Sequence, residues 1–572
     1  MSKEVGAILL DTRSIQKYVF SCNKLKTNVG ASYLVDGIFN DLMQNIILPK
    51  YNLKMPDISW KKSDGIQMIK DNTIKAEIVY IGGGNMLILI NKFLKEEDNL
   101  KLCRDIVSSW SLEILKKAPG LKTGAAIGMM DVSEDAFKDS LDDMYVQLKQ
   151  NQNTVLPQVD LPYTGLTLEC DISGKTADTF DWMEKDKKWI AKEVKAKTDA
   201  YKYAAKKVRS EYKDILEKDG SRDKYDFAIE LEKIGCKEGE SYISVIHIDG
   251  NNMGVKFSKC KDSQERKKLS LTVVKIVQKA FRELIQSIID EYDSKAYDEA
   301  LDKRDLIDDK GKKLLPIRPI IIGGDDITFV CPARVGIEYA KRFIEAVNKQ
   351  DFLNDEQYER MSREVKEENK SMKLSKTMSC CGGVAIVPLK YPFFRAYQLA
   401  EHLCSSAKTK SRQDDSSLID FAILYGEMTP SLEQLCRYQY VAPEGYLHYG
   451  PYYIKKNSDE DIADKSSIND LLSLKDKLKA KVANNEIKDK LKDKVASNKI
   501  KELRDVLTRD LHAQIRFLEN CEGVRDIIKE ECNTKDIEAK AFWQKKDGED
   551  DLKTRYVDAI EIIDFTLPNK ED

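Results

Sequence analysis

The feature that most constrains the fold of this chain is an internal duplication. An apolar strand that ends in an aspartate opens each copy: VGAILLD at 5–11 and YISVIHID at 242–249. In both copies a polar turn follows, and then a long segment with apolar residues at intervals of three and four, which predicts a helix. The whole order is strand, helix, strand, strand, helix, strand. It predicts an α+β chain with two tandem ferredoxin-like domains.

The spacing of matching residues supports the duplication. Chance similarity is the alternative, because few residues are identical between the copies. Three pairs of separations agree closely: Asp11–Ser32 and Asp249–Ser270 (21 positions each), Asp11–Gly82 and Asp249–Gly323 (71 and 74), and Gly124–Lys149 and Gly383–Lys408 (25 each).

The second copy contains the hairpin PIIIGGDDITFV. Two apolar runs read as strands, and Gly323 and Gly324 permit the tight reversal between them. Asp325 and Asp326 therefore stand at the hairpin tip. Adjacent carboxylates repel each other, so a rigid turn that holds two of them is typical of a site for Mg²⁺ or Mn²⁺. The alternative is an ordinary solvated turn.

The first copy has a different tip at the same place. The segment EIVYIGGGNMLILI puts Gly84 and Asn85 where the second copy has its two aspartates. Neither residue supplies a negative charge, so only the second copy can hold a divalent cation fully. The first copy is then a degenerate partner that could shape a nucleotide pocket between the copies.

Asp249 is the third expected ligand. In a split βαβ unit the first strand lies beside the hairpin, which brings the end of HID to the glycine turn. Carboxylates from adjacent strands can hold one or two Mg²⁺ ions for nucleotidyl transfer. Gly250, Asn251 and Asn252 follow directly and offer backbone N–H groups to phosphates. A strand-end aspartate that caps a turn is the alternative for Asp249.

Three further residues have both a functional and a structural interpretation. Lys408, near the end of a predicted helix, could neutralise a triphosphate or complement the helix dipole. Ser270, at the predicted start of its helix, could contact a base or ribose or act as an N-cap. His247 shares a strand face with Asp249 and could support the site or be a core histidine.

The remaining segments predict the domain organisation. The Lys-rich stretch from Trp182 onward, interleaved with Trp and Tyr, reads as a helical linker whose aromatic residues face a core, with RNA binding as the alternative. The chain after about residue 467 shows helical spacing of leucines and valines. The predicted domains are a degenerate first domain (1–165), a helical linker (166–238), a second, catalytic domain (239–430) and a helical C-terminal domain (431–572).

Composition limits the partners and the compartment. A hydrophobic content of 42% allows a sizeable core, while the 33% of charged residues nearly cancel to a net charge of -3. Global charge thus predicts neither a nucleic-acid nor a membrane partner. The chain has no apolar run of membrane-spanning length and no evident signal peptide, and its twelve cysteines follow no extracellular pattern. We therefore expect a cytoplasmic protein with reduced thiols.

These motifs resemble the CRISPR polymerase family, the large double-palm subunit of type III CRISPR effector complexes. The resemblance spans roughly residues 1–453. GGGN at 82–85 is similar to the degenerate turn of the family's first palm and GGDD at 323–326 to the intact turn of the second. HIDGNNMG resembles the Asp-Gly-Asp-Asn-Met-Gly signature, and AEHLCSSAK resembles the helix whose lysine meets the triphosphate, which diguanylate cyclases share.

The resemblance implies two palm domains of the nucleotide cyclase and polymerase type. It also implies conversion of ATP to cyclic oligoadenylates, which act as antiviral second messengers. Asp249, Asp325 and Asp326 would be catalytic metal ligands and Lys408 a phosphate contact. The expected nucleotide-binding residues are Gly250, Asn251, Asn252, Ser270, Gly323, Gly324 and Lys408.

Three departures from the family pattern qualify this expectation. Asn251 replaces the second Asp of the signature, which would weaken the hold on one metal. Cys170 retains only the first cysteine of a Cys-x-x-Cys-Gly zinc element, so zinc is not expected. The chain starts directly at the first palm, without an HD nuclease domain, so DNA cleavage is not expected.

Two functions remain as hypotheses. The first is a Mg²⁺- or Mn²⁺-dependent nucleotidyltransferase that makes cyclic oligonucleotides from ATP or another nucleoside triphosphate. The second is a non-catalytic scaffold that binds nucleotide or guide RNA and organises partners. RNA and the small helical subunits of a type III complex are the expected partners, and the oligomeric state stays open.

Overall fold

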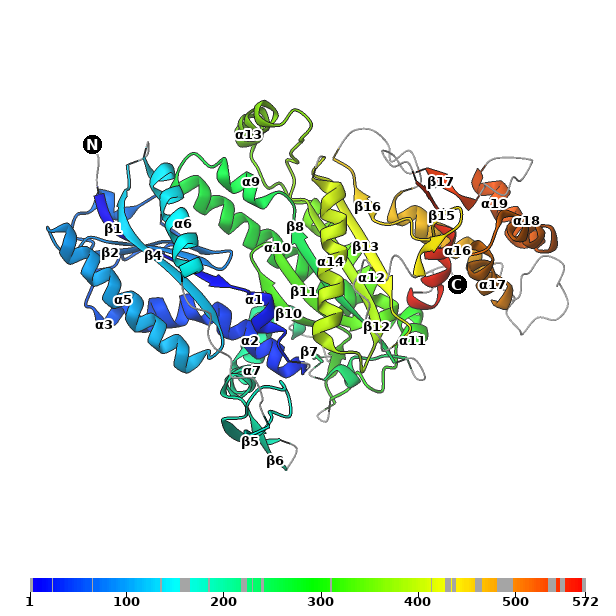
Figure 1. The fold of residues 1–572 in the computed structure, drawn as a ribbon, viewed down its shortest axis with the longest axis horizontal. Coiled ribbons are helices and arrows are strands. Elements are labelled where there is room, and N and C mark those ends of the chain that lie inside the picture. The colour runs from blue at the N-terminus through cyan, green and yellow to red at the C-terminus, as the bar shows by residue number, and fades with distance from the viewer. Residues whose placement is uncertain are drawn as a thin grey trace.

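The structure is a computed structural model in which two sheets lie side by side and the C-terminal helices lie at one end (Figure 1). It describes residues 4–567 apart from these gaps: 23, 64, 134–135, 155–164, 184–185, 218–223, 229, 238–240, 309–310, 413, 427–433, 435–438, 458–465, 481–496, 533–541 and 546–550.

The first domain is a four-stranded antiparallel sheet in the order β2-β3-β1-β4. This is the order of a ferredoxin-like fold, as predicted. Two helices that follow β3 and β4 pack on β1 and β4. The elements are β1 (Glu4–Arg13), α2 (Leu25–Gly37), β2 (Ala76–Gly82), β3 (Asn85–Ile90), α5 (Glu96–Lys117), β4 (Lys122–Asp131) and α6 (Phe137–Thr154).

The second domain repeats that order and extends it, as β10-β11-β8-β12-β13-β16. Its last strand lies beyond residue 430, so this sheet continues past the predicted domain boundary. The elements are β8 (Tyr242–Gly250), α9 (Met253–Ser258), α10 (Ser263–Glu291), β10 (Arg318–Gly323), β11 (Asp326–Pro332), α12 (Ala333–Asn348), β12 (Cys380–Pro388), α14 (Phe393–Ser411), β13 (Ser417–Ile423) and β16 (Tyr452–Lys455).

The strand registers of the two domains confirm the duplication. Asp11 on β1 pairs with Asn85 on β3, and Asp249 on β8 pairs with Asp326 on β11 in the same way. Each hairpin also has a register shift in its first strand, two to four residues before the first glycine of the turn. The shift lies between Ile78 and Tyr80 in β2 and between Pro319 and Ile321 in β10. A shared bulge at the same place is strong evidence for one ancestral unit.

Burial explains why the central strand reads as one apolar run. Residues 243–248 of β8 are all buried, because α12 and α14 both contact this strand and β11 and β12 flank it. Gly383 on β12 lets α14 approach closely, since a Cβ there would lie 2.0 Å from the Ala400 carbonyl oxygen. This close contact fixes the helix that carries Lys408.

The linker is less helical than predicted. It contains the hairpin β5 (Thr179–Met183) and β6 (Asp186–Ile190), then α7 (Lys192–Glu211) and the short strand β7 (Tyr225–Phe227). The expectation that its aromatic residues face a core is correct for Tyr212, which is fully buried, and wrong for Trp182 and Trp189, which are 68% and 43% exposed. Alternation along a strand, rather than helical periodicity, places these rings on one open face.

The C-terminal region is mainly helical, as predicted, with a small sheet that the prediction lacked. The sheet order is β14-β15-β18-β17. None of the helices that the structure describes is long and apolar enough to cross a membrane. The elements are β14 (Val441–Ala442), β15 (Gly445–Tyr446), α16 (Ile468–Ala480), α17 (Ser497–Leu507), α18 (Leu511–Asn520), α19 (Glu522–Cys532), β17 (Gln544–Lys545), β18 (Leu552–Lys553) and α20 (Tyr556–Glu561).

Candidate functional site

The candidate site lies where the tip of the β10–β11 hairpin meets the end of β8. Asp249 and Asp326 are direct cross-strand partners, so their side chains leave neighbouring strands side by side. Asp325 occupies the turn, and its carbonyl oxygen accepts a hydrogen bond from the Gly250 N–H at 3.2 Å. The structure thus brings the three predicted carboxylates to one end of the sheet.

The hairpin turn depends on its glycines as predicted. Gly324 has a φ of 58°, a conformation that favours glycine, and the matching Gly83 of the first domain has a φ of 59°. Nothing lies within 4 Å of a Cβ built on Gly323 or Gly324. The space beside the two glycines is therefore open.

The carboxylates influence one another electrostatically. Burial, followed by the negative charges of Asp249 and Asp326, raises the pKa of Asp325 from 3.8 to about 7. A carboxyl group whose pKa is raised this far is costly to ionise without a nearby cation. The arrangement therefore favours binding of a positive charge at the hairpin tip.

Lys408 supplies one such positive charge from α14. Its Nζ donates to Asp249 Oδ2 at 2.5 Å and to the Gly250 carbonyl oxygen at 2.9 Å. Burial is the largest single effect and lowers the pKa of Lys408, but the charge of Asp249, its hydrogen bond and the charge of Asp325 together leave the pKa above its ordinary value. The lysine predicted from the sequence is thus a charged member of the site.

His247 lies on the other side of Asp326. Its ring is 3% exposed, and Nδ1 lies 3.2 Å from Thr328 Oγ1 and 3.3 Å from Asp326 Oδ1. Burial is the largest single effect and lowers the pKa of His247, but the charge and hydrogen bond of Asp326 together with the charge of Asp249 raise it above its ordinary value. The histidine is therefore a buried neighbour that helps to orient Asp326.

The donor set fits an oxygen-seeking cation. Mg²⁺ and Mn²⁺ prefer carboxylate ligands, and the buried Oδ1 of Asp326 accepts no well-directed hydrogen bond. Within the described ranges, however, no three His, Cys, Asp or Glu side chains lie close enough to hold one metal ion. In this structure the ammonium group of Lys408 is the cation that compensates Asp249.

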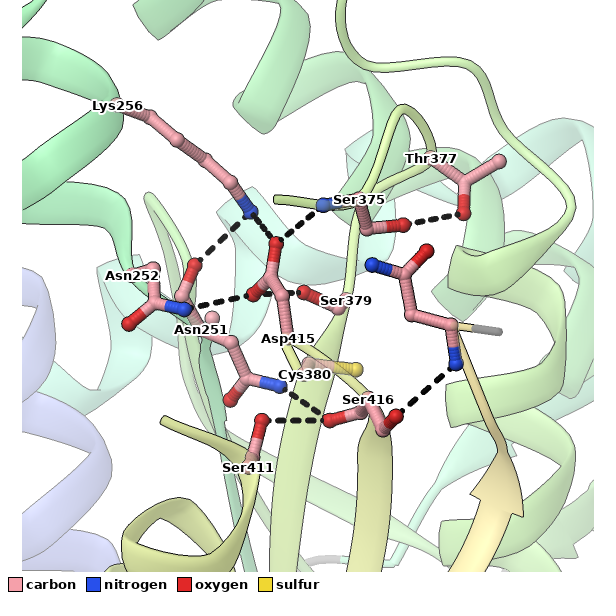
Figure 2. A network of polar contacts seen from close by, with 12 residues as sticks. Asn251, Asn252, Lys256, Ser375, Thr377, Ser379, Cys380, Ser411, Asp415 and Ser416 are labelled. Carbon is pink, nitrogen blue, oxygen red and sulfur yellow. Dashed lines mark hydrogen bonds and ion pairs between the residues drawn. The ribbon is translucent and has the colours of Figure 1, made fainter. Parts of the chain in front are cut away.

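A network of polar contacts stabilises the loop after Asp249 (Figure 2). Asn251 is 2% exposed, and its Nδ2 donates to the Ser416 carbonyl oxygen at 2.9 Å. Its backbone N–H donates to the Ser379 carbonyl oxygen at 3.0 Å. The Asn251 side chain is thus committed to the loop 411–416, away from the three carboxylates.

A buried ion pair anchors the same loop. Lys256 and Asp415 are both fully buried, with Lys256 Nζ 2.9 Å from Asp415 Oδ2. Lys256 Nζ also donates to the Asn251 carbonyl oxygen at 3.1 Å, and Asn252 Nδ2 donates to Asp415 Oδ1 at 3.0 Å. Asn252 and Asp415 both have left-handed backbones, with φ of 52° and 55°. Two strained turns therefore stabilise each other.

No local sequence pattern indicates this pair. Lys256 follows the glycine-rich turn on a short helix and resembles a surface lysine, while Asp415 lies in the polar run RQDDSS. Only the fold brings α9 beside the loop that follows α14. Buried polar residues of this kind are recognised from their burial in the structure, not from their spacing in the sequence.

The prediction for Ser270 was wrong in one respect. The helix α10 begins at Ser263 and is capped by Asp262, so Ser270 is an interior residue. Its side chain faces the first domain, because a Cβ on Gly82 would lie 2.7 Å from Ser270 Oγ. Ser270 therefore lies at the contact between the second domain and the degenerate hairpin.

The first domain has a counterpart of the site in which amides replace the second aspartate and the lysine. Gln152 Nε2 donates to Asp11 Oδ2 at 2.6 Å, just as Lys408 contacts Asp249. The predicted match of Lys149 to Lys408 is wrong, because it rested on aligning Gly124 with Gly383. Asp11 pairs with Gly124, whereas Asp249 pairs with Cys381, two residues earlier.

Comparison with known proteins supports the family resemblance. Residues 242–417 match the family model described as Cas10/Cmr2, second palm domain. A Csm1-Csm4 cassette in complex with cA4 is similar in fold, with a TM-score of 0.50 and 13% identity over 98% of this chain and 70% of that chain. No curated protein matches the chain.

Two further solved structures are similar at lower scores. A Csm1-Csm4 cassette in complex with pppApA has a TM-score of 0.48 and 12% identity over 98% of this chain and 70% of that chain. A Csm1-Csm4 subcomplex in the type III-A CRISPR-Csm interference complex has a TM-score of 0.44 and 13% identity over 91% of this chain and 65% of that chain. The family match and the fold together confirm the predicted tandem palm domains.

Proposed function

The chain carries, over residues 242–417, a second palm domain of the Cas10/Cmr2 family, and from this premise we propose that it is a metal-dependent nucleotidyltransferase. Its substrates would be nucleoside triphosphates, ATP foremost, and its products cyclic oligonucleotides, foremost the oligoadenylates that serve as antiviral second messengers. The same premise suggests a cytoplasmic setting, with RNA and the small subunits of a type III effector as partners.

The carboxylates have a defined role in this proposal. Asp249, Asp325 and Asp326 would hold Mg²⁺ or Mn²⁺, which activates a hydroxyl nucleophile and neutralises a pyrophosphate leaving group when it is bound. The Asp325 carboxyl, whose pKa is raised to about 7, would bind the cation as the carboxylate and release its proton. Metal affinity would then rise with pH across the neutral range.

Lys408 would act on the substrate rather than on the metal. It now pairs with Asp249, and a cation bound by Asp249 would free the ammonium group to contact the triphosphate. The backbone of residues 250–252 would cradle phosphates, and the open space beside Gly323 and Gly324 would admit the nucleotide. Ser270, which faces Gly82, would border the pocket between the domains.

One observation carries the proposal: the two domains share one register, and only the second has a charged residue at all three of the matched positions. Asp249, Asp326 and Lys408 occupy the positions that Asp11, Asn85 and Gln152 occupy in the first domain. A merely structural turn would not need a second carboxylate and an ammonium group where the duplicate is stable with one carboxylate and two amides. The charges therefore point to a ligand.

The test is turnover of labelled nucleoside triphosphates with Mg²⁺ or Mn²⁺, with and without added RNA. The double variant Asp325→Ala with Asp326→Ala should abolish product, whereas Asp142→Ala with Asp143→Ala should leave it unchanged. The control removes an adjacent pair of exposed aspartates on α6. Absence of product under every condition, or product that survives the first variant, would refute the proposal.

A non-catalytic scaffold is the second candidate, and one observation favours it. Asn251 stands where the family signature has an aspartate, and its side chain is buried against Ser416. A scaffold would bind nucleoside triphosphate or RNA and would co-purify with small subunits, yet it would give no product. Binding measured by calorimetry beside the turnover assay separates the two functions.

A further inference from the structure

A second cavity, away from the three carboxylates, lies between the two palm domains. It has a volume of about 740 Å³, and its described lining comes from residues 61–63, from the first half of α10 and from the segment 351–357. The helix α10 contacts β2 of the first domain as well as β10 and α12 of the second. We call this cavity the lysine pocket, after six of its lining residues: Lys61, Lys62, Lys267, Lys268, Lys275 and Lys376.

The lysine pocket is strongly positive on a chain whose net charge is -3. Only two acidic residues, Asp351 and Asp355, are among its described lining residues. Asp355 is already paired with Lys376, whose Nζ lies 2.6 Å from Asp355 Oδ1. The described lining therefore carries four more positive than negative charges.

Four of the lysines form no ion pair with any residue that the structure describes. These lysines, all of them exposed, are Lys61, Lys62, Lys268 and Lys275. Elsewhere on this chain lysines of similar exposure are paired, as Lys261 is with Glu356. Uncompensated charges that converge on one cavity raise the local concentration of anions.

The spacing of the lysines and the other lining residues indicate which kind of anion would bind. Lys268 and Lys275 lie seven residues apart on α10, about 10 Å along the same face of the helix, so their ammonium groups can contact different phosphates of one strand. Thr272 lies between them and Gln264 lies one turn before Lys268, and both add hydrogen-bonding groups to the lining. The only aromatic residue of the described lining, Phe352, is buried, so it offers no face for base stacking.

We propose that the lysine pocket binds the phosphate backbone of a single-stranded nucleic acid, without reading its sequence. A row of phosphates matches lysines that are spread along a helix, and each lysine that meets a phosphate releases a condensed counterion. Lys267 holds the two walls together, because its Nζ donates to the Ser63 carbonyl oxygen at 2.6 Å. The bound strand would therefore lie across the junction of the domains.

The experiment measures binding of a fluorescent oligouridylate by the full chain, using anisotropy at about 50 mM salt and upward. The variant Lys268→Glu with Lys275→Glu should weaken binding about tenfold or more and reduce the slope of log affinity against log salt by about 1.4. The matched control, Lys101→Glu with Lys117→Glu, changes the net charge equally on α5. It should leave affinity within about twofold.

The outcomes that would overturn the proposal are distinct. Equal weakening by both charge-reversal variants would show that only net charge matters. Displacement of the oligouridylate by inorganic tripolyphosphate at an equal phosphate concentration would assign the pocket to short polyphosphates. The neutral variant Lys268→Gln with Lys275→Gln should bind with intermediate affinity, which guards against loss of fold. No readout depends on nucleotide turnover, so the result is independent of the proposed function.

Discussion

Lys408 Nζ lies 2.5 Å from Asp249 Oδ2, and Gln152 Nε2 lies 2.6 Å from Asp11 Oδ2 in the corresponding place of the first domain. Both contacts join the last helix of a domain to the end of its first strand. One is an ion pair and the other a neutral amide on a carboxylate. The two domains thus keep the same scaffold and differ in the charge that the scaffold presents.

The variant Lys408→Gln would give the second domain the polar contact of the first. We expect a loss of turnover of about 10²-fold or more, because the side chain that neutralises developing phosphate charge is removed while the contact to Asp249 can persist. Steady-state kinetics with labelled ATP, beside thermal unfolding of the same preparation, measure the effect. Unchanged turnover would remove Lys408 from the proposed mechanism.

A second prediction concerns the pH dependence of stability. The pKa of Asp325 is raised from 3.8 to about 7, so the folded state holds a proton that the unfolded state loses between these values. Stability should therefore fall as pH rises from about 4 to about 7 and level off above. Asp325→Asn should remove this fall, stabilising the protein at pH 8 by up to about 4 kcal/mol and little at pH 4.

Denaturant unfolding at a series of pH values tests the prediction for Asp325. Asp143→Asn is the control, since Asp143 is exposed on α6. Added Mg²⁺ should stabilise the natural chain more at pH 8 than at pH 5, and the Asp325→Asn variant less at both. An identical pH profile for the natural chain and Asp325→Asn would contradict the raised pKa.

The contrast between the predicted and the unexpected residues has a physical basis. The duplicated fold and the convergence of Asp249 with Asp325 and Asp326 follow from strand periodicity, glycine turns and duplication, whereas the place of Lys408 in the site was expected from the family resemblance. The prediction placed Gly383 opposite Asp249, two residues from the observed partner Cys381. The reason is that apolar strand residues resemble one another, so a sequence comparison does not fix their register. Sequence periodicity indicates which apolar faces are buried, but it does not indicate buried polar pairs.

Lys256 and Asp415 illustrate what local sequence cannot reveal, and they supply a third prediction. Both are fully buried, so Lys256→Met leaves an uncompensated carboxylate and should cost about 3–5 kcal/mol of stability. The double variant Lys256→Met with Asp415→Asn should cost clearly less than the sum of the single variants. Urea unfolding of all four proteins gives the coupling energy.

The exposed pair Lys261 and Glu356 is the control for this cycle, with side chains 52% and 83% exposed. Its coupling should be less than about 1 kcal/mol. We also expect turnover to fall in Lys256→Met at temperatures where the fold persists, since the loop 250–252 loses its anchor. Additive energies for Lys256 and Asp415 would show that the buried pair does not hold the two loops together.

The contact between the second palm and the C-terminal region yields a last prediction. His448 Nε2 lies 2.8 Å from Asp420 Oδ1 on β13, and Nδ1 lies 2.8 Å from Asp558 Oδ1 on α20. Burial lowers the pKa of His448, but the charges of Asp558 and Asp420 outweigh it and hold the pKa well above its ordinary value. The imidazolium thus bridges two buried carboxylates. Its contribution to stability is present in full below about pH 6.5 and is lost as pH rises through the raised pKa.

His448→Gln should therefore loosen α20 most at pH 6, where the natural side chain is charged. Hydrogen exchange of peptides that cover Tyr556–Glu561 should become faster by about tenfold or more at pH 6, after correction for the intrinsic rate, and the difference should shrink as pH rises. Gln keeps hydrogen-bonding capacity but carries no charge, so it isolates the electrostatic part. The control is His512→Gln on α18, a residue that forms no ion pair with the described carboxylates. Equal exchange in the natural chain and His448→Gln at pH 6 would mean that other contacts hold the C-terminal helix to the palm.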